Sequence, residues 1–316
     1  MIVVHPYCEL IHEENPFLKI EKVGRTCYKS NSEYTSETAL KFYQMLRDRK
    51  HYGILEHVRF IFEIDTRDVD LIRECYCRPY FVCTEEMTNG KMRVLVSANL
   101  RALNEGRLAC GGEGAIPAFL DAISEKYSPE LDFAHYRHMI KPNYPIKVYR
   151  DISEVPNTTL YEQRCHSEIT VHFVLDRGIS HEFVRHREFS FAQESTRYCN
   201  YSLDKFNKNI TIVDSFFMRE DNSDARQVWY DSCRACEEAY FKLLDMGVTP
   251  QDARSVLPTC LKTELIMTGT LNMWKHFFDL RLYEKTGKAH PLAKISAEQA
   301  YKLIDERYAI KDNFNI

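Results

Sequence analysis

One stretch constrains the fold of this 316-residue chain most strongly: an apolar strand pattern that leads into a dense group of cations. Residues 169–175 alternate between large apolar side chains and other side chains, which is typical of a strand with one well-buried face. Residues 176–178 predict a turn, and Ser180 is expected to cap a short helix that delivers Arg185. A strand-turn-helix unit of this kind presents the next residues to a ligand.

The next segment, 185–198, holds three arginines, a histidine and two serines. An arginine stays charged and offers a planar fork of donors that fits phosphate or carboxylate. Like charges set this close repel, so the arrangement is favoured when an anion lies between them. If the segment is extended, Arg185 and Arg187 share one face, as do Ser195 and Arg197. These residues predict a binding site for a small anion.

Composition limits the other classes of function. The chain is 44% hydrophobic and 28% charged, as expected of a soluble globular protein with one large domain or two small ones. Its 42 basic and 46 acidic side chains give a formal net charge of -4, which argues against nucleic acid or a membrane as a partner. No apolar run reaches the roughly 20 residues that span a bilayer, and the first residues do not resemble a signal peptide. We therefore expect a cytoplasmic protein.

The eleven cysteines are scattered and odd in number, which argues against a disulfide scaffold. Cys233 and Cys236 have the spacing of a zinc or redox pair, but they lie within a helical pattern and no second CxxC exists. We interpret them as helix-core residues and predict no metal site.

Other elements can be predicted from local signals. Residues 2–4 and 57–64 read as strands, and Thr35 or Ser36 should cap a helix that ends near residue 49. Asn89-Gly90 is a strong hairpin-turn signal. From 65 to 161 the other signals are weak. The strands at 57–64 and 167–175 are alike in pattern, but no periodic repeat is evident.

The C-terminal third is predicted to be helical. One helix should cover about 225–246, with Gly247 just past its end, and Thr249-Pro250 should begin the next. A longer helix is expected from about 260 to 283. Arg254 and Arg281 lie in or beside these apolar patterns, and a buried arginine needs either a bound anion or an acidic partner in the protein. Both explanations stay open at this point.

Common catalytic signatures are missing: there is no GxSxG, P-loop, HExxH or Rossmann glycine motif, and no spacing selects a Cys-His pair. The residues alone predict a site for a nucleotide-like anion, with substrate positioning or a bound cofactor supplying the chemistry.

Several motifs carry a resemblance to a known family. Arg185-His186-Arg187, followed after seven residues by Ser195, resembles the RHRx7S motif of the flavin-dependent thymidylate synthases (ThyX), and residues 196–198 continue that family's S-x-R-Y. Four further segments resemble family motifs in the same order: the turn at 24–28, the Leu-Glu-His ending of 51–57, the A-R-x-x-L-P of 253–258 and the F-L-x-L-R of 277–281. The resemblance covers about 1–64 and 165–285.

The resemblance implies an α+β subunit with a mixed sheet packed against a long C-terminal helical region. It implies a single domain over 1–316 with an insertion at about 65–164. It also implies a homotetramer with active sites at subunit interfaces that binds FAD, dUMP, NADPH and methylene-tetrahydrofolate and makes dTMP.

Site residues follow by position. The resemblance assigns to dUMP Glu182, Arg185, Gln193, Ser195, Thr196, Arg197, Arg254 and Arg281. It assigns to the flavin His51, Gly53, Arg185, His186, Arg187, Gln193, Thr270, Asn272 and His276. The catalytic residues are then Arg281, which would favour the ionised uracil, and Ser195, a ligand-positioning hydroxyl.

The chain departs from the usual family pattern at five positions. Ala192 and Gln193 stand where asparagine and glutamate are common, whereas Thr270, Asn272 and His276 stand where Asn, Arg and Asn are common. Two alternatives remain: a related flavin-dependent enzyme that forms another one-carbon product, such as hydroxymethyl, and a nucleic-acid-binding protein. The acidic net charge argues against the second.

Overall fold

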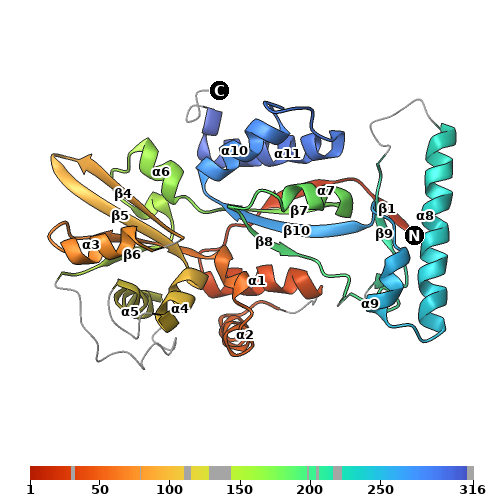
Figure 1. Ribbon diagram of the computed structural model, residues 1–316, viewed down its shortest axis with the longest axis horizontal. Helices are drawn as coiled ribbons and strands as arrows, with labels where there is room; N and C mark the ends of the chain where they lie inside the picture. Colours follow the sequence, from red (N-terminus) through yellow and green to blue (C-terminus); the bar gives the residue numbers. More distant parts are fainter. Residues whose placement is uncertain are drawn as a thin grey trace.

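The computed structural model describes residues 1–29, 33–78, 80–109, 115–127, 144–197, 199–203, 206–215 and 223–311. Two four-stranded sheets lie end to end, and a smaller group of strands and helices stands at the far end of the second sheet (Figure 1). Tyr198 of the S-x-R-Y match lies outside the described residues.

The first sheet is antiparallel and has the order β4-β5-β3-β6. Its strands are β3 (Arg59–Ile64), β4 (Phe81–Thr88), β5 (Lys91–Asn99) and β6 (Lys147–Tyr149). The predicted strand at 57–64 is therefore confirmed as β3, in the interior of the sheet. Asn89 and Gly90 join β4 to β5 with φ values of 53° and 74°, which confirms the predicted hairpin turn.

Helices pack against this sheet and share a hydrophobic core with its strands. They are α1 (Pro16–Tyr28), α2 (Ser36–Asp48), the short η1 (Tyr52–His57), α3 (Val69–Tyr76), α4 (Leu100–Ala109) and α5 (Ala115–Tyr127). Phe62 of β3 stacks on Phe119 of α5 with ring centroids 3.9 Å apart. Thr35 caps α2 as predicted, and its side chain accepts the N–H of Thr38.

The second sheet is also antiparallel, with the order β2-β7-β10-β8. Its strands are β2 (Tyr7–Leu10), β7 (Ile169–Asp176), β8 (Ser190–Gln193) and β10 (Lys262–Gly269). The helices α7 (Arg177–Phe183), α10 (Leu271–Arg281) and α11 (Pro291–Tyr308) contribute to its core. Trp274 of α10 is fully buried there and donates to the backbone oxygen of Ile169.

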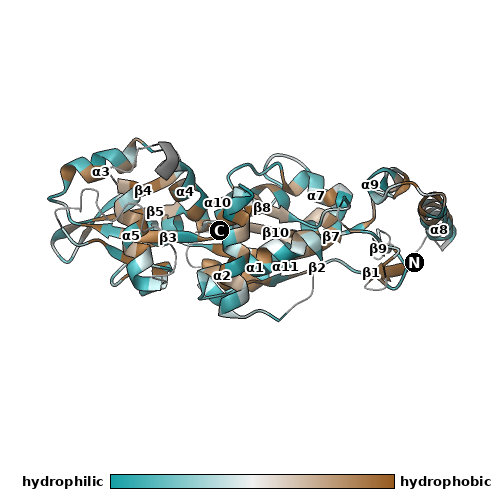
Figure 2. Ribbon diagram, turned by 90° about the horizontal axis from the view of Figure 1, so that it is seen from below, coloured by the Kyte–Doolittle hydropathy of each residue, from teal (hydrophilic) through white to brown (hydrophobic). Residues whose placement is uncertain are grey.

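The remaining elements complete the chain. They are the parallel pair β1 (Ile2–Val4) and β9 (Thr211–Val213), α8 (Ser223–Asp245), α9 (Pro250–Ala253), and the short helices η3 (Ile152–Glu154), α6 (Leu160–His166) and η5 (Arg254–Val256). The predicted helix at 225–246 is confirmed as α8, and Gly247 follows it with a φ of 85°. Helix α8 stands at the opposite end of the molecule from α3 (Figure 2).

The predicted long helix at 260–283 is wrong. Residues 262–269 form β10, which pairs with β7 on one side and β8 on the other, and only residues 271–281 are helical. The apolar residues at 261 and 265 fit a helical spacing. The backbone N–H and C=O groups of β10 instead form hydrogen bonds with two neighbouring strands from distant parts of the chain.

Two shorter predictions also need correction. Asp176, not Ser180, caps α7, because its carboxylate accepts the N–H of Ile179 at 2.7 Å. The segment 24–28 is the last part of helix α1, not a turn.

These elements confirm the predicted α+β class, and the sheets of the described chain include both parallel and antiparallel pairs. Within the described residues no helix is long and apolar enough to cross a membrane. Strand β3 precedes the segment 65–164 yet pairs with β5 and β6 from it. This segment is therefore built into the first sheet, and whether it is an insertion stays a prediction.

Candidate functional site

The cationic segment lies between α7 and β8. Helix α7 ends at Phe183, whose fully buried ring packs edge-to-face on Phe277 of α10. Residues 184–189 then turn before β8 begins at Ser190, so Arg185 and Arg187 do not lie on a strand and the condition for them to share one face is not met. Both arginines are exposed, and neither forms an ion pair with another described residue.

Arg281 joins α10 to α7. Its Nη1 donates to the carboxylate of Glu182 at 2.7 Å, its Nη2 to the Glu182 backbone oxygen at 3.1 Å, and its Nε to Nε2 of His186 at 3.2 Å. Burial lowers the pKa of His186 to about 4, with Arg281 and His276 adding to the effect. His186 is thus neutral near pH 7 and can accept a hydrogen bond from the guanidinium. The acidic partner that the sequence left open for Arg281 is Glu182.

A second group of predicted substrate residues follows β8. Nη1 of Arg254 donates to Oγ1 of Thr196 at 3.1 Å, and Arg254 is exposed instead of internal as expected. The backbone N–H of Arg197 donates to Oγ of Ser195 at 3.3 Å. Gln193 donates to Ser180 at 2.8 Å and to Thr263 at 3.2 Å, which fixes its amide within the protein.

A cavity of about 620 Å³ opens between the two four-stranded sheets. This volume falls in the range of about 300–1,000 Å³ typical of small-molecule sites. Its lining comes from both sheets and mixes aromatic, polar and charged side chains. The residues are Glu56, Arg59, Tyr80, Phe81, Val82, Asn99, Arg101, Ala102, Glu105, Cys165, Glu168, Arg187, Glu188, Phe189, Ser190, Thr268, Gly269, Thr270, Asn272 and Met273.

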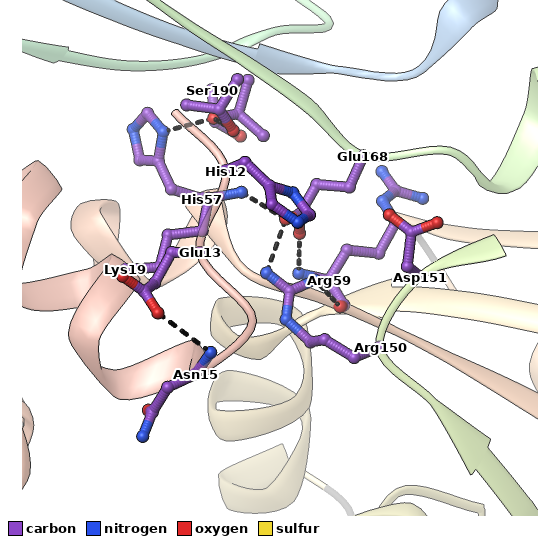
Figure 3. Close-up of polar contacts among 12 residues, drawn as sticks. His12, Glu13, Asn15, Lys19, His57, Arg59, Arg150, Asp151, Glu168 and Ser190 are labelled. Atoms are coloured by element: carbon purple, nitrogen blue, oxygen red, sulfur yellow. Dashed lines mark hydrogen bonds and ion pairs between the residues drawn. The ribbon is translucent and has the colours of Figure 1, made fainter. Parts of the chain in front are cut away.

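Glu168 forms a charged centre beside this cavity (Figure 3). Its carboxylate accepts from Arg150 at 2.6 Å and also from Lys19 and the backbone N–H of Arg59. Burial alone would raise the pKa of Glu168, but Arg150 and Lys19 outweigh that effect and hold it at about 2. Because these partners come from α1, β3 and the segment after β6, Glu168 fixes the junction between the sheets.

The structure brings only some predicted flavin residues together. Arg187, Thr270 and Asn272 line the cavity. Gln193 and Arg185 do not, and His186 is buried against Arg281 instead. His51, Gly53 and His276 are exposed and lie outside the cavity lining, although the ring of His276 lies 6.0 Å from that of His186.

The sequence did not point to several lining residues. Arg59, Tyr80, Asn99 and Arg101 come from the segment around 57–105, where the motifs gave no functional assignment. Arg101 is held by two carboxylates, Glu56 and Glu105, with Glu105 at 2.9 Å. A pattern of Asn-x-Arg at the start of a helix, such as 99–101, was the available signal.

The fold and this site define an α+β protein with a cavity for a small molecule between its two four-stranded sheets. A model of the family described as thymidylate synthase complementing protein (Thy1) matches residues 147–306. The match covers half of the chain, so the chain belongs to this family. The resemblance to flavin-dependent thymidylate synthases inferred from the motifs is thereby confirmed.

Relatives of known description agree with the family match. A flavin-dependent thymidylate synthase of Geobacter sulfurreducens is 38% identical over 111 residues, which is 35% of this chain and 46% of that protein. One from Pyrococcus furiosus is 36% identical over 109 residues, or 34% of this chain and 43% of its own length. The chain thus spans less than half the length of these two relatives.

Two further matches are longer but weaker. A flavin-dependent thymidylate synthase of a Synechocystis species is 26% identical over 194 residues, covering 56% of this chain and 86% of that protein. The solved structure of a UMP/dUMP methylase from Streptomyces cacaoi, bound with 5-Br dUMP, has a TM-score of 0.39 at 21% identity and covers 49% of this chain and 76% of its own.

Proposed function

We propose that this protein is a flavin-dependent thymidylate synthase, which converts dUMP to dTMP with methylene-tetrahydrofolate as one-carbon donor and NADPH as reductant through FAD. The family match over 147–306, which contains the Arg185–Ser195 motif, is the observation that carries the proposal. In the overall reaction the methylene carbon and a hydride form the new methyl group, and the proton on C5 of the uracil leaves.

Arg281 and Arg254 have separate roles in this proposal. Arg281, fixed by Glu182 and His186, would hold a cation at the uracil edge and favour its ionised form. Arg254 and Thr196, together with Arg185, Ser195 and Arg197, would bind the phosphate, since exposed arginines are suited to bidentate phosphate contacts. No described base is hydrogen-bonded to Ser195, so its hydroxyl would position the ligand.

In this proposal the flavin occupies the cavity between the sheets. The cavity offers the aromatic side chains of Phe81 and Phe189 for a planar ring and donors from Arg187 and Asn272 for phosphates. Three of the four lining carboxylates are already paired: Glu56 and Glu105 hold Arg101, and Glu168 holds Arg150 and Lys19. The fourth, Glu188, is exposed. The flavin would supply the hydride chemistry. The chain's residues would orient the flavin. The hydrogen bonds of Glu168 with Arg150 and with the backbone N–H of Arg59 would fix this part of the cavity lining.

Self-association belongs to the proposal as well. The resemblance predicts a homotetramer with sites completed between subunits, and the exposed Arg185 and Arg254 leave room for groups from another chain. The location in the cytoplasm stays a prediction.

The visible absorption spectrum tests this function first. We expect purified protein to be yellow, or to bind added FAD, and to oxidise NADPH faster when dUMP is present. A colourless protein that cannot be reconstituted with FAD would contradict the proposal. The mass of the nucleotide product separates dTMP from a hydroxymethyl product, and a steep salt dependence of oligonucleotide binding would favour nucleic-acid binding instead.

A further inference from the structure

The two four-stranded sheets have the same topology. The first sheet, read from β4, has the order β4-β5-β3-β6, and the second, read from β8, has the order β8-β10-β7-β2. Every neighbouring pair of strands in both sheets is antiparallel. The order along the chain also agrees, apart from β9, α8, α9 and η5, which stand between β8 and β10. With these set aside, β3, α3, β4, β5 and α4 correspond to β7, α7, β8, β10 and α10. In Figure 1, α5 lies below the first sheet and α11 above the second, as a half-turn would place them.

The registers agree residue by residue. Ser97 of β5 faces Ile61 on one side and Val82 on the other, whereas Thr268 of β10 faces Thr170 and Ser190. These partners make Ser97 the counterpart of Thr268.

The helix starts correspond as well. Asp68 and Asp176 stand at the N-caps of α3 and α7. Asn99 accepts the N–H of Ala102 at the start of α4, and Thr270 accepts the N–H of Met273 at the start of α10. Asn99 is therefore the counterpart of Thr270.

Two buried histidines connect the halves in a reciprocal way. His57, just before β3, has its Nδ1 2.7 Å from Oγ1 of Thr268 in the other sheet. His166, just before β7, has its Nδ1 2.9 Å from Oγ of Ser97 in the first sheet. His57 and His166 are counterparts, and so are their partners Thr268 and Ser97. The two contacts are therefore equivalent, as a twofold relation between the sheets requires.

Each sheet takes one edge strand from the other half of the chain. β2, near the start of the chain, pairs with β7, and β6 pairs with β3. The family match begins at residue 147, the first residue of β6, and ends within α11. We therefore define a first repeat, 7–127, and a second repeat, 147–308. The second repeat alone contains the matched family module.

The cavity lies on the twofold relation between the repeats. Most of its lining residues fall into counterpart pairs, including Arg59 with Glu168, Phe81 with Phe189, Asn99 with Thr270, Arg101 with Asn272 and Val82 with Ser190. The charges of the counterparts differ: the counterpart of Arg101 is the uncharged Asn272, and the positions of Arg185 and His186 are occupied in the first repeat by Cys77 and Arg78. An axial cavity with unlike halves fits one asymmetric ligand.

We propose that the chain is a fused pair of family modules that keeps one flavin site, with Arg187 contributed by the second repeat and Asn99 and Arg101 by the first. Asn and Arg are common in the family at positions 270 and 272, where this chain has Thr270 and Asn272. The counterpart positions in the first repeat hold Asn99 and Arg101. Nε and Nη1 of Arg101 are held by Glu105 and Glu56, and its Nη2 has no hydrogen bond within the described part of the chain. The flavin identity of the ligand rests on the proposed function; the pairing of the repeats does not.

Direct titration of the full-length protein with FAD, followed by quenching of flavin fluorescence, tests this assignment. Wild type should bind one FAD per chain. Arg101→Gln should weaken binding by about 10- to 100-fold, the loss expected for one charge-assisted hydrogen bond, and Arg101→Lys should recover part of it. Arg78→Gln is the matched control: it removes the same charge from the same repeat at a position outside the cavity lining, and its affinity should stay within about twofold of wild type.

The possible outcomes separate the two proposals. No FAD binding by wild type would overturn the proposed function and, with it, the flavin assignment. Unchanged affinity in Arg101→Gln, or two FAD per chain, would overturn the single shared site while leaving the proposed function intact. Circular dichroism shows whether Arg101→Gln is folded. If it is not, Asn99→Ser replaces it, because serine can still cap α4. We expect Asn99→Ser to lower the affinity for FAD by less than Arg101→Gln does.

Discussion

Arg281 and Glu182 form the ion pair that connects the last turn of α10 to α7, with Nη1 and the carboxylate oxygen 2.7 Å apart. The same guanidinium donates to a neutral His186. This pair fixes the cation that we propose lies at the pyrimidine ring.

Replacing that cation should abolish the reaction without unfolding the protein. In Arg281→Ala we expect dTMP formation to fall by about 1,000-fold or more, because a preorganised charge is lost from the reacting edge. The side chain is partly exposed, so little core volume is removed. Steady-state kinetics and a thermal melt measure the two effects. Lys285→Ala, which removes an exposed cation shortly after α10, is the control and should behave as wild type. Normal activity in Arg281→Ala would show that Arg281 is misassigned.

Ser195→Ala should be milder. Its hydroxyl accepts the N–H of Arg197, and no described base activates it as a nucleophile. We expect a loss of about tenfold or less, as for one hydrogen bond to a ligand. Ser202→Ala, which removes a comparable loop hydroxyl bonded to Asn200, should leave the rate unchanged. Complete inactivation by Ser195→Ala would point to covalent catalysis.

Arg254→Ala should raise the KM for dUMP by about 10- to 100-fold and leave kcat nearly unchanged, because a phosphate contact contributes equally to substrate and transition state. Arg234→Ala on the exposed face of α8 removes an equivalent charge and provides the comparison. A drop in kcat at constant KM would remove Arg254 from the phosphate site.

The buried histidines predict acid sensitivity. Burial, with nearby cations, lowers the pKa of His57 and that of His166 to about 3 each, well below the ordinary value near 6.5. The unfolded chain therefore binds more protons between these values, so stability falls as pH drops from about 6.5 towards 3. Each histidine should cost about 2 kcal/mol between pH 7 and pH 5. Urea unfolding at both pH values measures the change.

His166→Gln should reduce this pH dependence, whereas His12→Gln, at an exposed position, should not. Equal pH dependence in wild type and His166→Gln would mean that the pKa of His166 is the same in the folded and unfolded states.

The repeat also changes the expected assembly. The resemblance alone predicts four chains, but each chain holds two modules, so two chains already supply four. We therefore expect light scattering to give twice the chain mass of 37.2 kDa. Four times that mass would show that the fused modules assemble as if each chain were a single subunit.

Local signals in the sequence were sufficient for many elements. The Thr35 cap, the Asn89-Gly90 turn and Gly247 act within a few residues, and all three were found. β10 was missed because its partners β7 and β8 are distant in sequence, and its apolar spacing also suits a helix.

The cavity could not be predicted for a related reason. Arg101 and Arg187 line the same cavity only because the two repeats fold against each other, and the middle segment had no recognisable motif of its own. Two similar strands, each preceded by a histidine, His57 and His166, were the trace of that repeat in the sequence. The cationic motif, by contrast, was visible because its donors lie within fourteen residues.

Mass spectrometry of the nucleotide product shows whether the protein converts dUMP to dTMP. The purified protein is incubated with dUMP, FAD, NADPH and methylene-tetrahydrofolate, and the reaction is repeated without the folate. We predict dTMP, one methylene heavier than dUMP, in the complete reaction only. Unchanged dUMP from a FAD-loaded protein, or a hydroxymethyl product, would contradict the assignment as a thymidylate synthase.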